Sequence, residues 1–183
     1  RLRNRMHYQT INEISDNSRV IVDSNIFIYS ALRHPKYHRS CYNLFTKIEE
    51  GHIRGYIPSI VIQEVLHRLM IAELQKISGE KDLQKIKNHI RKNPQLFKTL
   101  SICWTAVEQI FKMGFTVLGE TADSIHKSIL FSQKYSLFAK DSVILSIMDT
   151  YGIDTLVTND NDFQSIPWLQ IYKPDEYTTH SDS

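Results

Sequence analysis

Short apolar runs along the chain alternate with longer segments in which apolar residues recur every three or four positions. The runs predict five short strands, which cover residues 19–22, 55–57, 115–118, 154–158 and 169–172. The first of them has apolar side chains at three successive positions, so we expect both of its faces to be buried, as in a parallel sheet.

The longer segments have the period of an amphipathic helix. Residues 38–50 carry apolar side chains at positions i, i+3, i+4 and i+7, which form one helical face (Cys41, Leu44, Phe45 and Ile48). Gly51 is the predicted end of this helix. The same period predicts further helices over 60–75, 101–113, 121–134 and 140–151, with Ser59 and Thr121 as candidate N-caps.

Strands that alternate with helices predict an α/β fold with a single parallel sheet and right-handed crossovers. We therefore expect a Rossmann-like, three-layer architecture with helices on both faces of the sheet. The chain is divided into an N-terminal extension (1–18), one domain (19–174) and a C-terminal tail (175–183). No internal repeat or linker divides the domain further.

The overall composition is that of a globular domain, with 42% hydrophobic and 23% charged residues. A net charge of +2 means that any basic surface for nucleic acid must be local. One such segment is 76–98, a charged helix and loop that Gly79 and Pro94 interrupt. It either follows a phosphate backbone or is an ordinary solvated helix face.

The sequence also bears on location. No apolar run approaches the roughly 18 residues of a membrane span. The two cysteines, Cys41 and Cys103, do not suggest a disulfide framework, and free thiols are typical of a reducing compartment. We expect a cytoplasmic protein that does not associate with membranes.

Four carboxylates occupy positions that a parallel sheet would bring together. Asp23 and Asp160 follow the first and fourth predicted strands, and Glu64 and Asp141 lie near the starts of two helices. Ligand sites of open parallel sheets form beyond the carboxyl ends of the strands. Each acid alone has an ordinary explanation as a turn former, a helix-dipole partner or a solvated side chain, so the inference depends on the set.

Clustered carboxylates repel one another, and a divalent cation relieves the repulsion. Oxygen ligands are those that Mg²⁺ and Mn²⁺ prefer. Such an ion lowers the pKa of a bound water and stabilises charge on a phosphoryl group, which is the chemistry of phosphodiester hydrolysis. The histidines and cysteines show no spacing typical of a zinc site.

Four segments resemble, in order, the motifs of the PIN-domain ribonuclease family. They are VIVDSNIFI (20–28), IPSIVIQEV (57–65), DSVILS (141–146) and LVTNDNDF (156–163). The resemblance covers about residues 19 to 174. It implies a Rossmann-like sheet with strand order 3-2-1-4-5 and Mg²⁺- or Mn²⁺-dependent endonucleolytic cleavage of RNA.

The resemblance also implies roles for individual residues. It makes Asp23, Glu64 and Asp141 the metal ligands and catalytic acids, and it makes Asp160 the fourth acid. Asp162 is a rival for that fourth place, with loop structure as its other explanation. Two polar residues would orient the carboxylates or the attacking water (Asn25 and Thr158).

Many small members of the family are VapC-like toxins of toxin–antitoxin pairs. For this chain the resemblance therefore implies an RNA substrate, an antitoxin protein as partner and a homodimer. The segment from about 73 to 100 is longer than in a compact toxin, which bears on the toxin assignment more than on the nuclease assignment.

Three basic residues are candidates for substrate contacts. Lys140 precedes the third acid, where its ammonium could pair with Asp141 and compete with the metal, or could contact a substrate phosphate. Arg33 and Lys36 follow the first motif and either flank the cleft or belong to a polar surface loop.

Other functions remain open at this stage. A non-catalytic PIN-like module that binds RNA or protein typically lacks one or more of the acids, whereas all four are present here. An RNA-processing nuclease that is not a toxin would carry the same motifs. A haloacid-dehalogenase-like enzyme would need Asp in place of Asn25, and a nucleotide-binding Rossmann protein would need a Gly-rich turn after the first strand.

Overall fold

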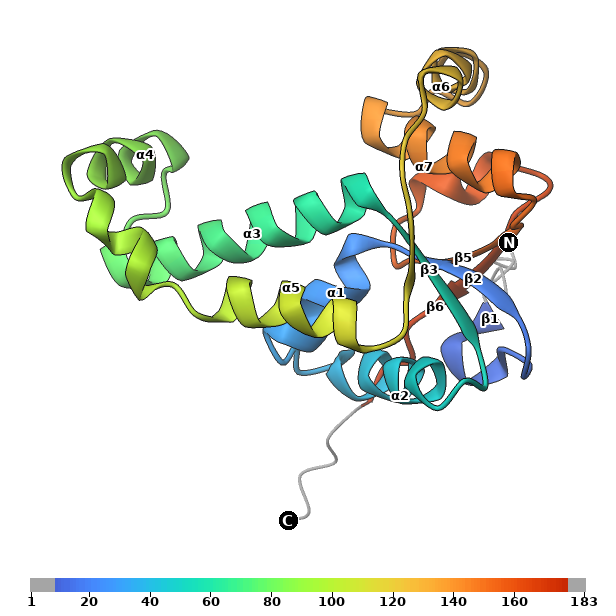
Figure 1. The fold of residues 1–183 in the computed structure, drawn as a ribbon, viewed down its shortest axis with the longest axis horizontal. Helices are drawn as coiled ribbons and strands as arrows, with labels where there is room; N and C mark the ends of the chain where they lie inside the picture. Colours follow the sequence, from blue (N-terminus) through green and yellow to red (C-terminus); the bar gives the residue numbers. More distant parts are fainter. Residues whose placement is uncertain (1–8, 178–183) are drawn as a thin grey trace, which may run out of the picture.

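The computed structural model describes residues 9–177, and parts of the predicted N-terminal extension and C-terminal tail (1–8 and 178–183) lie outside the described residues. Its centre is one six-stranded sheet in which every strand pair is parallel (Figure 1). The strand order is β1-β6-β5-β2-β3-β4. The strands are β1 (Gln9–Thr10), β2 (Arg19–Val22), β3 (Arg54–Pro58), β4 (Thr116–Leu118), β5 (Thr155–Val157) and β6 (Gln170–Lys173).

The five predicted strands are all present, and their relative order is the expected 3-2-1-4-5. The sixth strand, β1, was not predicted. It lies within the expected N-terminal extension and pairs with β6 at the edge of the sheet, where Gln9 is opposite Tyr172. Ile11 and Ile14, which follow it, are buried. The sheet therefore includes residues that precede residue 19, and a strand of two residues leaves no periodic pattern by which the sequence could reveal it.

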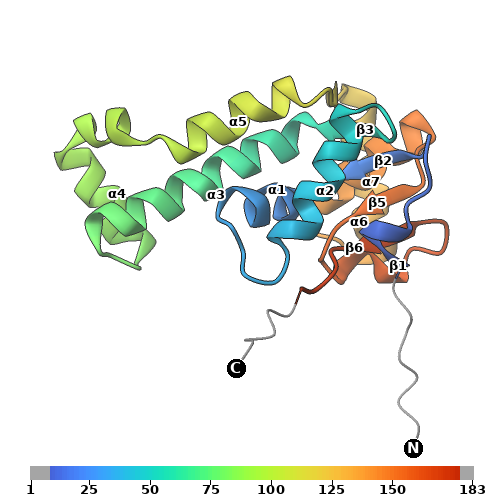
Figure 2. The same cartoon turned by 90° about the horizontal axis from the view of Figure 1, so that it is seen from below.

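Helices cover both faces of the sheet, as predicted (Figures 1 and 2). Crossovers that lead from β2 to β3 and on to β4 place α1, α2, α3 and α5 on one face, and the return to β5 places α6 and α7 on the other. The helices are α1 (Ser24–Ala31), α2 (His38–Glu49), α3 (Ser59–Ser78), α4 (Leu83–Lys92), α5 (Ile102–Lys112), α6 (Ala122–Tyr135) and α7 (Ala139–Tyr151), with 3-10 turns η1 (Ile11–Glu13), η2 (Pro94–Thr99) and η3 (Asp162–Ser165).

The core lies on both sides of β2, whose residues Val20, Ile21 and Val22 are fully buried. The residues of α7 from Asp141 to Met148 are all buried, and this helix packs closely against α6. On the opposite face, Gly55 of β3 allows α2 to approach, because a Cβ at this position would lie 2.8 Å from Ile48. The burial of both faces of β2 confirms the prediction made from its continuous apolar run.

Two expectations about the helices were wrong. Helix α1 was not predicted, because its apolar residues Ile26–Ile28 are consecutive and give no helical period. Asp23 caps this helix by accepting a hydrogen bond from the Ser24 amide.

The second expectation concerned the start of α3. Ser59 is not an N-cap but the first residue of α3. The carboxylate of Glu120 caps α3 instead, because it accepts hydrogen bonds from the Ser59 hydroxyl and the Ile60 amide. Thr121 does cap α6, as predicted.

Helix α3 runs beyond the sheet and forms, together with α4, η2 and α5, an arm that projects from the domain (Figures 1 and 2). As predicted for residues 76–98, Gly79 ends α3 in a left-handed conformation and Pro94 follows α4. None of the helices in the described part of the chain combines the length and the apolarity needed to cross a bilayer.

Glu73, close to the far end of α3, joins the two long helices of the arm. This buried α3 carboxylate accepts hydrogen bonds from the amides of Ser101, Ile102 and Cys103, at 2.9, 3.0 and 2.7 Å, and so caps the start of α5. Burial alone would raise the pKa of Glu73, but these three amides lower it below the ordinary value of 4.5.

We expect Glu73→Gln to lower the free energy of unfolding by about 1–2 kcal/mol at pH 7, because charge-assisted hydrogen bonds to the helix terminus are lost. A carboxylate with a lowered pKa in the folded state stabilises the fold fully above its unfolded pKa of 4.5, and this stabilisation is lost as the pH falls through the lowered value. Urea unfolding from pH 7 to pH 3 should show the two proteins converging in acid. A difference that persists undiminished in acid would contradict the cap.

Candidate active site

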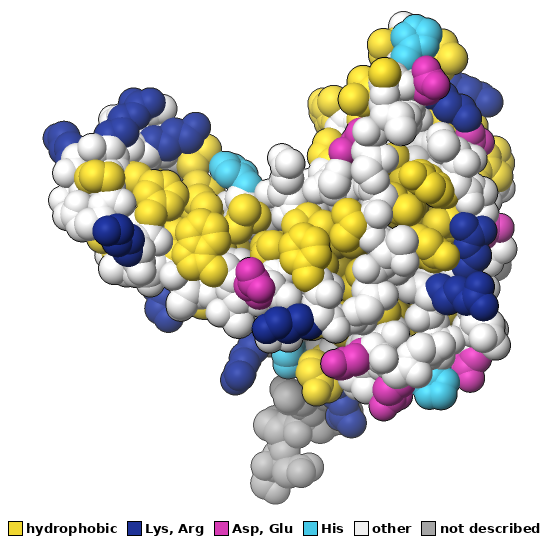
Figure 3. Space-filling model, viewed as in Figure 1, with side chains coloured by type: hydrophobic (Ala, Val, Ile, Leu, Met, Phe, Trp, Pro, Cys, Tyr) yellow, Lys and Arg dark blue, Asp and Glu magenta, His cyan; other side chains and the backbone are white. Residues whose placement is uncertain are grey.

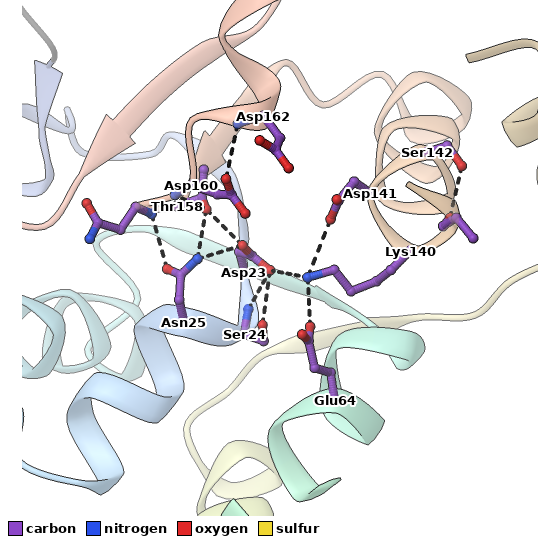
Figure 4. A network of polar contacts seen from close by, with 12 residues as sticks. Asp23, Ser24, Asn25, Glu64, Lys140, Asp141, Ser142, Thr158, Asp160 and Asp162 are labelled. Atoms are coloured by element: carbon purple, nitrogen blue, oxygen red, sulfur yellow. Dashed lines mark hydrogen bonds and ion pairs between the residues drawn. The ribbon is translucent and has the colours of Figure 1, made fainter. Parts of the chain in front are cut away.

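Side chains from five elements meet at the carboxyl ends of β2 and β5 (Figure 4). Asp23 directly follows β2, and Thr158 follows β5. Glu64 lies near the start of α3, and Asp141 lies in the first turn of α7. The structure thus brings the predicted acids to the sheet edge at which parallel α/β folds bind their ligands.

Asp23 is the most enclosed of these acids, with 1% of its side chain exposed. Its Oδ1 accepts hydrogen bonds from the amide and hydroxyl of Ser24, at 2.7 and 3.3 Å. Its Oδ2 accepts from Asn25 Nδ2 at 2.7 Å and from the Thr158 hydroxyl at 2.8 Å. Four donors therefore offset the cost of burying this charge and fix the orientation of the carboxylate.

Asn25 and Thr158 are themselves joined, because Asn25 Nδ2 also lies 2.9 Å from the Thr158 hydroxyl oxygen. The Oδ1 of Asn25 accepts from the amide of Asn159 at 3.1 Å, and the side chain of Asn159 donates to the Tyr29 hydroxyl. The sequence had not singled out Asn159, and the only signal for it was its place inside the fourth motif. This network ties the end of β5 to α1.

Asp160 is held by its neighbours in the loop after β5. Its amide donates to the Thr158 hydroxyl oxygen at 3.0 Å, and its Oδ1 accepts from the amide of Asp162 at 3.1 Å. Asp162 is exposed and begins the turn η3. Asp162 therefore contributes a backbone donor that orients Asp160, an arrangement that favours Asp160 as the acid facing the cluster.

Lys140, on α7, places its ammonium among three of the carboxylates (Figure 4). Its Nζ lies 2.8 Å from Glu64 Oε2, 3.4 Å from Asp141 Oδ1 and 3.7 Å from Asp23 Oδ1. The side chain of Lys140 is 27% exposed, so water screens these interactions only in part. The sequence suggested a pairing with Asp141, but the shortest contact is with Glu64 on a different helix.

The charges in this cluster shift two pKa values. Burial alone would lower the pKa of Lys140, but the surrounding carboxylates, above all Asp23, raise it well above its ordinary range, so the ammonium stays protonated. Burial raises the pKa of Asp141; Lys140 lowers it, while Asp23 and Asp160 raise it further, and the net direction is upward. A single ammonium therefore does not fully compensate this group of acids.

The donor set fits a hard divalent cation in kind, because it consists of carboxylate oxygens alone. The Oδ1 atom of Asp141 is buried and has no hydrogen-bond donor, so it has capacity for another positive partner. As the side chains stand, no group of three acidic, histidine or cysteine residues within 9–177 is arranged to hold a metal ion. The ammonium of Lys140 lies between the acids, and a cation that binds them must displace it.

The chain matches the family model of the PIN domain over residues 20–169. It belongs to the PIN domain family. The predicted resemblance is thereby confirmed, and the matched range contains all four motifs.

Relatives of this PIN domain agree with the assignment. Ribonuclease VapC2 of Methanocaldococcus jannaschii is 28% identical over 156 residues, which are 85% of this chain and 94% of that protein. The toxin VapC20 of Mycobacterium tuberculosis, described as cleaving the sarcin–ricin loop, has the same fold with a TM-score of 0.56 at 13% identity, over 84% of this chain and 98% of its own. The DNA-bound VapBC2 complex of Rickettsia felis matches with a TM-score of 0.52 at 20% identity, over 86% of this chain and 99% of that chain.

The two other basic candidates of this PIN domain lie in the segment between α1 and α2. Lys36 is exposed and pairs with Glu176 at 3.5 Å. Arg33 is exposed in a left-handed turn directly after α1 and lines a groove that reaches Lys76 of α3. The structure places neither side chain in the carboxylate cluster of Figure 4, so their contact with substrate stays a prediction.

We expect Lys140→Met to destabilise the protein by about 1–3 kcal/mol in EDTA, because the acids lose their internal counter-ion; partial exposure keeps the cost below that of a fully buried pair. Mg²⁺ should restore more stability to the variant than to the wild type, because the cation no longer competes with an ammonium. Urea unfolding with and without Mg²⁺ measures both effects.

Lys127→Met is the matched control, because Lys127 forms a surface ion pair with Asp149. Its loss should cost less than about 1 kcal/mol and should not change the response to Mg²⁺. Equal Mg²⁺ responses of the Lys140 and Lys127 variants would sink the idea of an internal competitor.

Proposed function

We propose that this PIN domain is a divalent metal-dependent endoribonuclease that hydrolyses phosphodiester bonds. The observation that carries the proposal is the gathering of Asp23, Glu64 and Asp141 around one positive charge at the carboxyl edge of the sheet. The name of the relative Ribonuclease VapC2 supports RNA as the substrate.

Asp23, Glu64 and Asp141 would hold Mg²⁺ or Mn²⁺, with Asp160 as the fourth acid. Such an ion supplies an activated water and stabilises charge on the scissile phosphate. Asn25 and Thr158 keep the Asp23 carboxylate in one orientation. No cysteine, serine or histidine nucleophile is required.

If the metal displaces Lys140 from the acids, the ammonium of Lys140 would be free to contact a substrate phosphate. Arg33 and Lys36 would contact the RNA outside the cluster. The backbone amide of Asp162 donates a hydrogen bond to the Asp160 carboxylate and helps to hold it in the loop.

We further propose that the protein is the toxin of a toxin–antitoxin pair. The relatives named VapC and the VapBC complexes of similar fold support an antitoxin protein as its partner. A homodimer is supported by α6, whose side chains Ile125, Ile129 and Leu130 are exposed beside Phe138, which is 80% exposed; hydrophobic side chains gather over this helix in Figure 3. The free, buried cysteines Cys41 and Cys103 support a cytoplasmic location.

Cleavage of labelled mixed RNAs tests the proposed activity. We expect cutting with Mg²⁺ or Mn²⁺, none with EDTA, and a loss of at least about 100-fold in Asp23→Asn, since the variant loses a charged ligand. Asp16→Asn, the same change at an exposed site, should cut like the wild type. Metal-independent cutting, or full activity of Asp23→Asn, would falsify the assignment.

Thr158→Val tests the orienting network. The substitution keeps the shape of the side chain but removes the hydroxyl that donates to Asp23 and accepts from Asp160. We expect a loss of about 10- to 100-fold in Mn²⁺ affinity, measured by titration, and in cleavage rate. In the control Thr150→Val, which loses a hydroxyl bonded to the Ser146 carbonyl on α7, both quantities should stay within about two-fold of the wild type. Unchanged Mn²⁺ affinity in Thr158→Val would show that the hydroxyl is dispensable.

A further inference from the structure

The arm carries an unequal share of the positive charge of the molecule. Residues 76–98 contain seven Lys or Arg and two acids, whereas the other 160 residues contain fifteen Lys or Arg and eighteen acids. The body of the protein is therefore net negative and the free half of the arm is net positive. In Figure 3 dark blue side chains gather over α4 at the end of the arm. Such a separation within one chain points to an anionic partner at the arm.

The charge is concentrated on one side of α4. Ile86 is buried and Ile90 is partly buried against the arm, so they mark the inner side of the helix. At 3.6 residues per turn, the opposite side presents only cations and amides. This basic face of α4 consists of Gln84, Lys85, Asn88, Arg91 and Lys92. Hydrogen bonds from Gln84 and Arg91 to Asn88 Oδ1, at 3.3 and 3.5 Å, agree with a shared face.

Most of these cations are not used inside the molecule. Among the seven cations of residues 76–98, Lys85 alone has a carboxylate partner within the described residues, Glu80 at 3.9 Å, and that pair is exposed. Helix α4 packs mainly against α3 and η2 and contributes one fully buried side chain, Ile86. The fold therefore gives little reason for so many cations on α4.

The arm is placed where a substrate bound at the carboxylates would pass. Helix α3 carries Glu64 near its start and leads without a break to Ser78 at the base of α4, a length of roughly 20 Å. The arm and the α6–α7 pair enclose a hollow in Figure 3, and α3 and α7 flank it. Glu73 joins α3 to the start of α5 close to the far end of α3, so the basic face is held at a set distance from the acids.

We propose that the basic face of α4 binds the phosphate backbone of RNA at a distance from the cleavage site. This inference rests on the proposed function, because it assigns the far part of the same substrate. Protein interfaces are depleted in Lys and have apolar centres, whereas phosphates accept hydrogen bonds from Lys, Arg and amide side chains alike. The composition of this face therefore favours nucleic acid over an acidic protein.

The test compares a long and a short RNA. Binding of a single-stranded RNA of about 16 nucleotides is measured by fluorescence anisotropy in EDTA, where no metal-dependent cutting occurs, and the cutting of an RNA of about four nucleotides at saturating concentration is measured with Mg²⁺. The triple variant Lys85→Gln, Arg91→Gln, Lys92→Gln should bind the long RNA about 10- to 100-fold more weakly near 0.1 M salt. The slope of log affinity against log salt should fall by about 2, since each phosphate contact on a single strand contributes about 0.7. The rate at which the saturating short RNA is cut should stay within about two-fold of the wild type, because that RNA does not need to reach α4.

The control removes the same charge elsewhere. Lys47, Arg54 and Lys112 lie near the end of α2, the start of β3 and the end of α5, all toward the amino-terminal edge of the sheet, opposite the carboxylates. Their triple change to Gln should leave the affinity for the long RNA and the cutting of the short RNA within about two-fold of the wild type. Equal thermal stability of the two triple variants checks that the fold is intact.

Two outcomes overturn the proposal. If both triple variants weaken long-RNA binding equally, net charge and not the arm is responsible. If the arm variant cuts the saturating short RNA far more slowly than the wild type does, the cations act at the cleft. A failure of the proposed function would be recognised in the wild type, which would then neither bind the long RNA nor cut it with Mg²⁺.

Discussion

The negative charge of Asp23, buried at the end of β2, is the constraint on which the rest of the site depends. A carboxylate removed from water must be compensated by donors, and here the donors come from two elements. Ser24 and Asn25 supply donors from the first turn of α1, and Thr158 supplies a hydroxyl from the end of β5. The same bonds that stabilise this charge therefore also fix where α1 starts and how β5 ends.

Neutral hydrogen-bond donors do not compensate the negative charge of all the acids in the cluster. The ammonium of Lys140 supplies positive charge among them. Burial raises the pKa of Asp141 first, and Asp23 and Asp160 raise it further, whereas the pKa of Lys140 is raised by the carboxylates against the effect of burial. Grouping acids in this way costs stability unless a positive charge lies among them, and Lys140 provides one. Under the proposed function, a divalent cation would take the place of this ammonium.

The sequence predicted what depends on local periodicity and failed where distant residues decide. The apolar runs revealed five strands, the resemblance to the PIN family implied their order, and the helical period revealed α2, α3, α5, α6 and α7. It missed α1 because three buried residues in succession have no period, and β1 because the edge position beside β6 is a tertiary property. The caps of α3 and α5 are Glu120 and Glu73, separated from those helix starts by 61 and 29 residues, so no local pattern could indicate them. Likewise, spacing suggested Asp141 as the partner of Lys140, but only the fold shows that Glu64 is closer.

The acidic cluster repels a polyanionic ligand such as RNA, whereas the basic face of α4 attracts it. The carboxylates that would hold a metal repel phosphates, so affinity for the substrate must be supplied away from the reaction centre. Cations placed among the acids would be neutralised by them, as Lys140 is. A rigid helix solves this conflict, because it carries an acid at one end and leads to the basic face of α4 at the other, beyond the roughly 10 Å over which salt screens charge. Cleavage chemistry and backbone binding can then be separated in space while α3 keeps their distance constant.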